Sequence, residues 1–357
     1  MFSMPAQTAI SQFDHFCARS VNTIIVLFAL TILTACGSVQ HHTILERPSN
    51  KFASEVQKVM PSVIEVVSLF EYDVHEYHYA LDAAGNFIPD DTSRFGFRML
   101  TNDLESNVSV RVDRHMAFGS GVVIGENGDE YLVLTNRHIV VRKDSLVDYI
   151  HIDGKPSQAP LYRALLSKHE LAIRGLNNSL VHADLLVQDG RYDLAMLTVQ
   201  ARKIAAVVLP VQPAFYESPE PGRLAVMIGF PDEIRQAAIG LTGEAPYPGN
   251  FSISTYGDFG YSGGGVFAGS DDGDFVFIGI GRSIPAKTVS YVAPSEDFTK
   301  HYGLAPEDLR HLRIENMNIV NPSRMFAITI KQISTFIKKN YNLIASRRFE
   351  LNKKFLN

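Results

Sequence analysis

Short runs of β-branched and aromatic residues, separated by turn residues, dominate the sequence from about Phe52 onward and constrain the fold most strongly. Asn127-Gly128 and Asp272-Gly273 are examples of the intervening turn signals. Many short strands with little helical periodicity favour a closed β-barrel or a sandwich over an alternating α/β fold. The expected strands are Val63–Ser68, Gly121–Ile124, Tyr131–Thr135, Leu185–Val187, Ala195–Val199, Leu224–Gly229, Phe275–Ile280 and Phe326–Ile330.

Helical periodicity appears only near the C-terminus. Residues 69–116 and 284–324 show no clear period, so we expect long loops or insertions there. The predicted C-terminal helix would carry on one face Ile333, Phe336, Ile337, Tyr341 and Ile344.

Composition narrows the functional classes. The chain is 46% hydrophobic and 20% charged, which are globular proportions with enough apolar material for a sizeable core. Its formal net charge of −5 argues against a nucleic-acid partner, because polyanion binding needs a strongly basic face. The two cysteines are Cys17 and Cys36, so residues 37–357 cannot form an internal disulfide.

The N-terminal segment has the pattern of a targeting signal. Residues 21–33 form an apolar stretch of about 13 residues, shorter than the ~20 that span a bilayer but typical of a secretory signal. The string Leu33-Thr34-Ala35-Cys36-Gly37 then resembles the lipobox of bacterial lipoproteins. That resemblance implies a signal peptide over 1–35, lipidation of Cys36, and a polar tether over 36–52. The residue after the cysteine is Gly37 and not Asp, which resembles the sorting signal for an outer-membrane lipoprotein that faces the periplasm. The alternative to a lipoprotein signal is that this segment forms a short core helix with a buried cysteine.

One serine stands out chemically. Ser262 lies in Gly260-Tyr261-Ser262-Gly263-Gly264-Gly265, where glycines permit a tight turn and leave backbone N–H groups free to face a ligand. A serine hydroxyl is a weak nucleophile unless a base, an orienting acid and oxyanion donors accompany it. Upstream, His138 follows a predicted strand and Asp193 precedes another, which makes them the candidate base and acid.

These motifs together resemble the chymotrypsin-fold serine proteases, and most closely the bacterial HtrA/Deg-like branch. The resemblance rests on GSGVVI and LTNRHIV, then YDLAMLTV, then GYSGGGVF, in the family's order of His, Asp and Ser. It implies an all-β fold of two antiparallel six-stranded β-barrels with a C-terminal helix. The protease domain would cover 53–345 and leave 346–357 as a basic tail, with no PDZ module.

The resemblance also implies a role for each residue. His138 would act as general base and then general acid, Asp193 would hold the imidazole tautomer, and Ser262 would attack the scissile carbonyl. The backbone N–H groups of Gly260 and Ser262 would form the oxyanion hole. Asp189 is also near in sequence, but we interpret it as a turn residue. The implied activity is cleavage of peptide bonds in protein substrates, without a metal or organic cofactor.

Two alternatives remain. A protease-fold lipoprotein could bind proteins without cleaving them, although such proteins often lose the triad that this chain retains. The G-x-S-x-G string also satisfies the nucleophile elbow of α/β-hydrolases, which would need Asp297 and His301 or His311 after the serine. The region before Ser262 lacks the strand–helix alternation of that fold. In the protease comparison, Tyr261 replaces the usual Asn or Asp, so we expect no activation through a freed N-terminus.

Overall fold

The computed structural model describes residues 50–83, 85–101, 107–152, 155–214, 219–270, 272–294 and 312–356. The predicted signal peptide, Cys36 and most of the predicted tether therefore lie outside the described residues. The chain divides into two compact units, Met1–Ala53 and Ser54–Asn357, and the fold below is that of the second unit.

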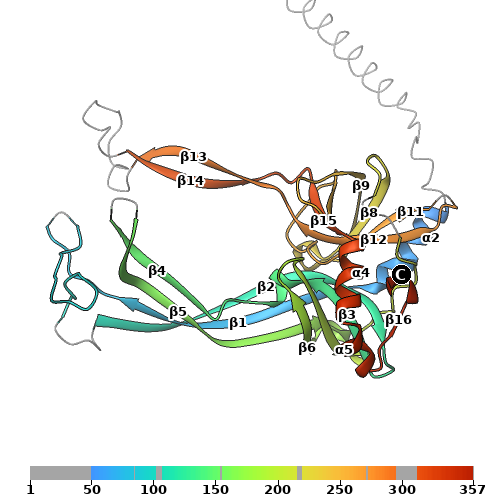
Figure 1. Ribbon diagram of the computed structural model, residues 1–357, viewed down its shortest axis with the longest axis horizontal. Helices are drawn as coiled ribbons and strands as arrows, with labels where there is room; N and C mark the ends of the chain where they lie inside the picture. Colours follow the sequence, from blue (N-terminus) through green and yellow to red (C-terminus); the bar gives the residue numbers. More distant parts are fainter. Residues whose placement is uncertain are drawn as a thin grey trace, which may run out of the picture. The chain divides into compact units, whose positions relative to one another are not determined.

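The first six-stranded antiparallel β-barrel lies in the N-terminal part of this unit (Figure 1). Pairing between β1 and β5 closes it. Its strands, in order around the barrel, are β1 (Val63–Tyr77), β2 (Val108–Glu126), β3 (Glu130–Asn136), β7 (Leu194–Gln200), β6 (Leu180–Asp189) and β5 (Lys155–Arg174). Alternate residues of these strands fill the interior, where Val133, Ile173 and Leu197 are fully buried.

The second barrel is closed in the same way by six antiparallel strands. They are β10 (Asn250–Ile253), β15 (Met325–Thr329), β12 (Phe275–Ser283), β11 (Gly265–Gly269), β8 (Leu224–Gly229) and β9 (Gln236–Glu244). Phe251, Ile253 and Val266 are fully buried within it. The predicted fold class, two antiparallel six-stranded β-barrels, is confirmed.

All eight predicted strands fall within observed strands, except that Ile330 already begins a helix. The expectation of long loops or insertions over 69–116 and 284–324 is correct only in part: the described residues between 78 and 101 form no more than isolated bridges, but strands occupy both ends of the first region and much of the described part of the second. β1 continues to Tyr77 and β2 begins at Val108, while β13 (Ala286–Pro294) and β14 (Leu312–Val320) form a two-stranded hairpin.

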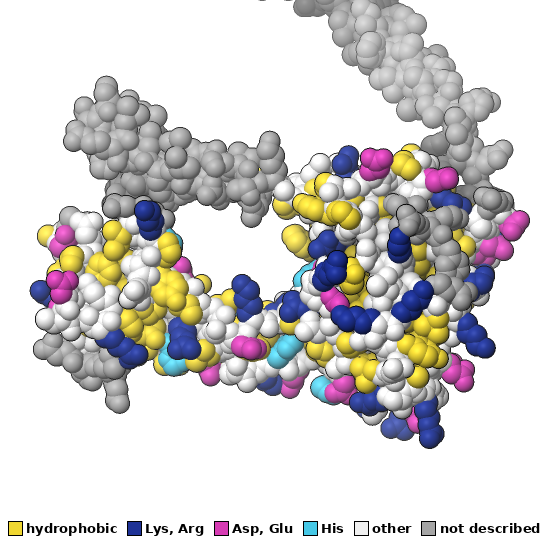
Figure 2. Space-filling model, in the orientation of Figure 1, with side chains coloured by type: hydrophobic (Ala, Val, Ile, Leu, Met, Phe, Trp, Pro, Cys, Tyr) yellow, Lys and Arg dark blue, Asp and Glu magenta, His cyan; other side chains and the backbone are white. Residues whose placement is uncertain are grey.

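In the first region, the part of β2 from Val108 to Met116 is exposed or half-buried on both faces, so it lacks the burial on one face that gives a strand its alternating pattern. Beyond the first barrel, β1, β2 and β5 continue as a sheet that β4 (Ser145–Ile152) joins at the edge of β5 (Figure 1). We call this sheet, formed by residues 69–77, 108–117, 145–152 and 155–168, the extension. Hydrophobic side chains gather on its surface over β4 and β5 (Figure 2), including Leu146 and Tyr149.

Helices are short. The described residues contain α2 (Asn50–Val59), α3 (Arg137–Val140), α4 (Ile330–Lys339) and α5 (Tyr341–Ser346), and none of them is long and apolar enough to cross a membrane. The predicted C-terminal helix is thus two helices that meet at Asn340. Its predicted buried face is correct for four of the five residues, but Tyr341 is 44% exposed.

The segment after α5 is not a free tail. β16 (Glu350–Leu351) pairs with β2, and the 3-10 turn Lys353–Leu356 follows it. Phe355 is 1% exposed, and its ring lies 6.2 Å from that of Phe277 in the second barrel. The backbone and apolar side chains of this segment therefore belong to the folded body, while Lys353 and Lys354 remain exposed.

Candidate active site

The loop that carries Ser262 is held between the two barrels by backbone hydrogen bonds. The Ser120 N–H of β2 donates to the Ser262 carbonyl at 2.7 Å, and the Gly263 N–H donates to the Gly281 carbonyl of β12 at 2.8 Å. Gly260 and Gly263 have φ of 103° and 80°, which only glycine adopts readily. A Cβ at Gly263 would also overlap the Ser120 carbonyl oxygen. The glycines flanking the serine are therefore required by both conformation and close packing.

His138 lies on α3, the four-residue helix that follows β3, and Asp193 fixes it at two points. The Asp193 carboxylate accepts the His138 backbone N–H through Oδ1 at 2.9 Å and contacts Nδ1 through Oδ2 at 2.8 Å. A carboxylate can only accept, so Nδ1 carries the proton and Nε2 is left as the acceptor. Asp193 has φ of 59°, a left-handed conformation in which Asp and Asn are enriched among non-glycine residues.

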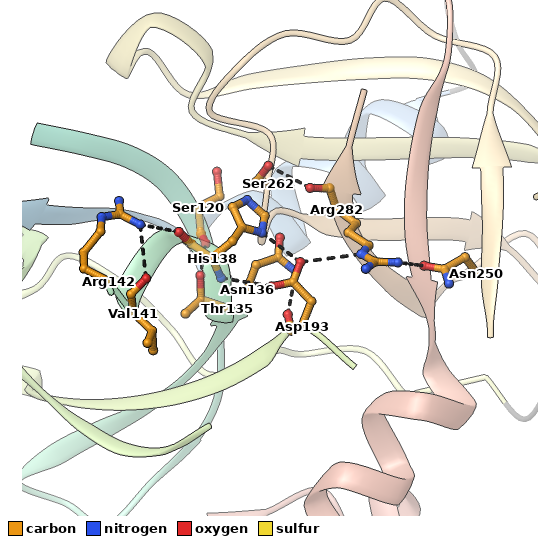
Figure 3. Close-up of polar contacts among 10 residues, drawn as sticks. All are labelled: Ser120, Thr135, Asn136, His138, Val141, Arg142, Asp193, Asn250, Ser262 and Arg282. Atoms are coloured by element: carbon orange, nitrogen blue, oxygen red, sulfur yellow. Dashed lines mark hydrogen bonds and ion pairs between the residues drawn. The ribbon is translucent and has the colours of Figure 1, made fainter. Parts of the chain in front are cut away.

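Arg282, on β12, contacts both the acid and the serine (Figure 3). Its Nε lies 3.5 Å from Asp193 Oδ2, and its Nη1 donates to Asn250 Oδ1 at 3.3 Å. The Ser262 hydroxyl donates to the Arg282 carbonyl oxygen at 3.0 Å. In this structure the serine proton is thus directed to Arg282, and the hydroxyl must rotate before it can donate to His138 Nε2.

Arg142 holds the other end of α3. Its Nη1 donates to the carbonyl oxygen of His138 at 2.5 Å and to that of Val141 at 3.3 Å. Its guanidinium lies 4.5 Å from the ring centre of Phe70, which belongs to β1 in the extension. Burial lowers the pKa of this guanidinium, although not enough to discharge an arginine at neutral pH. Our sequence analysis missed Arg142, and its position four residues after His138 is the only signal for it.

His138, Asp193, Ser262 and Gly260 share one cleft of about 800 Å³. Within the described part of the chain, the backbone N–H groups of Gly260 and Ser262 donate to no other protein group. The remaining lining residues come from both barrels and from the base of the β13–β14 hairpin: Ala117, Phe118, Ile139, Arg142, Tyr247, Asp258, Phe259, Arg282, Ser283, Ile284, Ala286 and Val320.

Tyr261, beside the serine, does not face this cleft. It is 4% exposed and packs in the core of the second barrel, and this burial raises the pKa of its hydroxyl. The position that departs from the resembled family's Asn or Asp therefore serves packing here.

Asp189 lies apart from His138. Its carboxylate accepts a hydrogen bond from Lys339 Nζ at 2.9 Å and one from the Arg191 N–H at 2.8 Å. The hydrogen bond from Lys339 holds the pKa of this carboxyl below its usual range. Asp189 is the last residue of β6, directly before the turn, and Asp193 is the acid next to the histidine.

The α/β-hydrolase alternative requires alternating strands and helices, and the two barrels contradict it. Its candidate partners Asp297, His301 and His311 lie outside the described residues.

Comparison with known proteins agrees with this geometry. Residues 119–280 match the family model of the trypsin-like peptidase domain, a range that contains His138, Asp193 and Ser262. A search of curated proteins gives no match. The matched range contains all or part of every barrel strand except β1 and β15, which complete the two closures. Residues 119–280 are therefore similar to a trypsin-like peptidase domain, within a body built on two six-stranded β-barrels.

Proposed function

We propose that this protein is a serine endopeptidase in which Ser262 is the nucleophile, His138 the general base and Asp193 the orienting acid. The observation that carries the proposal is the double contact of the Asp193 carboxylate with His138, at the backbone N–H and at Nδ1, in the cleft that Ser262 also lines. A fixed tautomer with Nε2 free to accept a proton is what a serine hydroxyl needs to become a nucleophile.

The reaction would begin when Ser262 Oγ leaves the Arg282 carbonyl and donates to His138 Nε2. Oγ then attacks the scissile carbonyl carbon, and its proton passes to Nε2. The new oxyanion would accept hydrogen bonds from the free N–H groups of Gly260 and Ser262, each of which is worth on the order of 10²–10³ in rate in comparable sites. His138 next gives its proton to the leaving amine, and water repeats the sequence on the acyl-enzyme.

A fluorophosphonate probe tests the nucleophile directly, because it phosphonylates only an activated serine. We expect labelling of the purified wild type, with the adduct mapped to Ser262 by mass spectrometry, and none in Ser262→Ala. Ser283→Ala is the matched control, since Ser283 lines the same cleft and should keep the label. An unlabelled wild type with an intact fold would support the alternative of a protease-fold protein that binds without cleaving.

We further propose that the protein is a lipoprotein of the bacterial cell envelope, anchored through Cys36 and related to the HtrA/Deg-like branch. The support is the sequence Leu33-Thr34-Ala35-Cys36 directly after a short apolar segment. At least two acyl chains are needed for stable anchoring, as bacterial lipoproteins carry. Unfolded or exposed protein segments in the periplasm would be the substrates.

Replacement of the proposed acyl acceptor tests the anchor. Cys36→Ser should block lipidation and processing, leave the precursor uncleaved, and remove the acyl mass from the N-terminal peptide. Fractionation of the wild type should place it with the outer membrane. A soluble wild-type protein with its N-terminus upstream of Cys36 and no acyl mass would contradict the anchor and leave the peptidase proposal unaffected.

A further inference from the structure

β2 has an open edge over half of its length. It pairs with β1 throughout Val108–Val122, but β3 pairs with it only from Gly121 onward. Among the residues that the structure describes, no strand pairs with the other edge of β2 between Val108 and Gly119. The outward N–H and C=O groups of this segment are therefore available to another extended chain.

Natural sheets usually protect such an edge with proline, charges or a short strand. β2 is 19 residues long and contains no proline, and the arginines of this segment, Arg111 and Arg114, pair with Glu76 and Glu71 of β1. Val110, Val112, Arg114 and Met116 occupy alternate positions on one face of the edge, where the three apolar residues are 59%, 52% and 49% exposed. A long edge with exposed apolar side chains is a template for β-strand addition.

The open edge leads directly into the cleft. Its last residues, Ala117 and Phe118, line the cleft together with His138 and Ser262. In the proposed mechanism His138 gives its proton to the leaving amine, so the segment after the scissile bond lies on the His138 side of Ser262. That side belongs to the first barrel, which contains β2. An extended polypeptide that leaves the cleft past Phe118 therefore reaches the open edge without a turn.

We propose that the edge of β2 from Phe118 to Val108 binds the part of the substrate that follows the scissile bond, as an added β-strand. This inference rests on the proposed peptidase function and specifies its substrate class. Eleven residues at about 3.3 Å each give a track of roughly 35 Å. The preferred substrate is an unfolded polypeptide with eight or more residues after the cleavage site. Apolar residues at alternate positions would contact Val112 and Met116.

Peptides of increasing length test the inference. All share one sequence before the bond and carry two, six or ten residues after it. Each cross-strand pair contributes a fraction of a kcal/mol, so kcat/KM should rise at least about tenfold from the shortest to the longest. Val112→Glu should collapse the ratio of long-peptide to short-peptide kcat/KM toward one. Ile239→Glu is the matched control, because Ile239 is 54% exposed on β9 and does not line the cleft, and it should keep the ratio.

An N-methyl scan of the longest peptide, cleaved by the wild-type protein, avoids any effect of mutation on folding. Pairing along one strand edge uses every second N–H of the added chain. Methylation should therefore lower kcat/KM at alternate positions only. A uniform effect, or none, would overturn the inference.

Binding to Ser262→Ala separates this inference from the proposed function. Fluorescent versions of the same peptides should bind it more tightly with increasing length. Absence of turnover for every peptide would refute the peptidase proposal, while this binding series would still decide the role of the edge. Length-independent binding and cleavage would overturn the inference. So would self-association of the wild type that Val112→Glu abolishes, because a second copy of the chain would then occupy the edge.

Discussion

Replacing Asp193 by Asn isolates the chemistry of the proposed acid from the stability of the fold. Asn has the same shape and is, with Asp, among the non-glycine residues best suited to the left-handed conformation at φ of 59°. Its amide oxygen can still accept the His138 backbone N–H that Asp193 Oδ1 accepts at 2.9 Å. Its NH₂ group, however, would face Nδ1, where Oδ2 now lies at 2.8 Å. Two donors would then meet unless the imidazole moves its proton to Nε2.

That tautomer cannot accept the Ser262 proton. The same exchange in serine proteases costs about 10⁴ in kcat, which corresponds to roughly 5–6 kcal/mol of transition-state stabilisation. We expect a loss of this order for Asp193→Asn against a peptide substrate. The melting temperature should change by no more than a few degrees, because the carboxylate is exchanged for a group of equal size.

Asp189→Asn is the matched control. It makes the same change at the end of β6, four residues earlier, at a carboxylate that pairs with Lys339 at 2.9 Å and does not contact His138. Its activity should remain within about twofold of the wild type, since this carboxylate contacts none of the three proposed catalytic residues. Equal activity of wild type and Asp193→Asn, or a larger loss in Asp189→Asn, would refute the assignment of Asp193.

Three further predictions concern stability. Phe355→Ala removes a ring that is 1% exposed, so we expect a loss of about 3–5 kcal/mol in urea unfolding; a loss near zero would mean that the C-terminal segment is not part of the body. Gly263→Ala should lower both activity and melting temperature, because a Cβ there overlaps the backbone at φ of 80°. In the control Gly269→Ala the new Cβ meets no atom within 4 Å, so activity and melting temperature should stay unchanged; equal effects of the two variants would contradict this reasoning. Glu65 is fully buried, and Arg174 binds it at 2.5 and 3.2 Å, so Arg174→Met leaves a buried carboxylate without its counter-ion. We expect Arg174→Met to lower the free energy of unfolding by about 3–5 kcal/mol, and the double variant with Glu65→Met to recover most of that loss. No recovery in the double variant would refute the argument from burial.

The strands of the barrels and the three proposed catalytic residues could be predicted from the sequence because each depends on local patterns, whereas the closure into two six-stranded barrels was expected only from the family resemblance. Strands buried on one or both faces gave recognisable apolar runs, and all eight predicted strands lie within observed ones apart from Ile330. The glycines around Ser262 are dictated by positive φ and close packing, which makes their pattern specific. His138 comes shortly after the end of β3, and Asp193 comes directly before β7, so the motif of each contains buried residues of a core strand.

Features that depend on distant contacts could not be predicted. The contact of Arg282 with Asp193 is one of them, because it joins residues of different barrels. Phe355 lies in a basic segment, and nothing nearby in sequence indicates that its ring packs near Phe277. The strands of the extension were not predicted for a different reason. A strand exposed on both faces, such as β2 before Phe118, lacks the alternation by which a half-buried strand is recognised.

The resting position of Ser262 is compatible with the proposed mechanism on energetic grounds. Its hydroxyl donates to the Arg282 carbonyl at 3.0 Å, and the proposed reaction needs that proton on His138 Nε2. The change exchanges one neutral hydrogen bond for another, and a single such bond contributes only about 0.5–1.5 kcal/mol net. A typical kcat of about 10 s⁻¹ corresponds to a barrier of roughly 16 kcal/mol, so this rotation is a minor part of it. Correct alignment of His138 matters far more, and Asp193 and Arg142 supply it by holding both the ring and the backbone carbonyl of that residue.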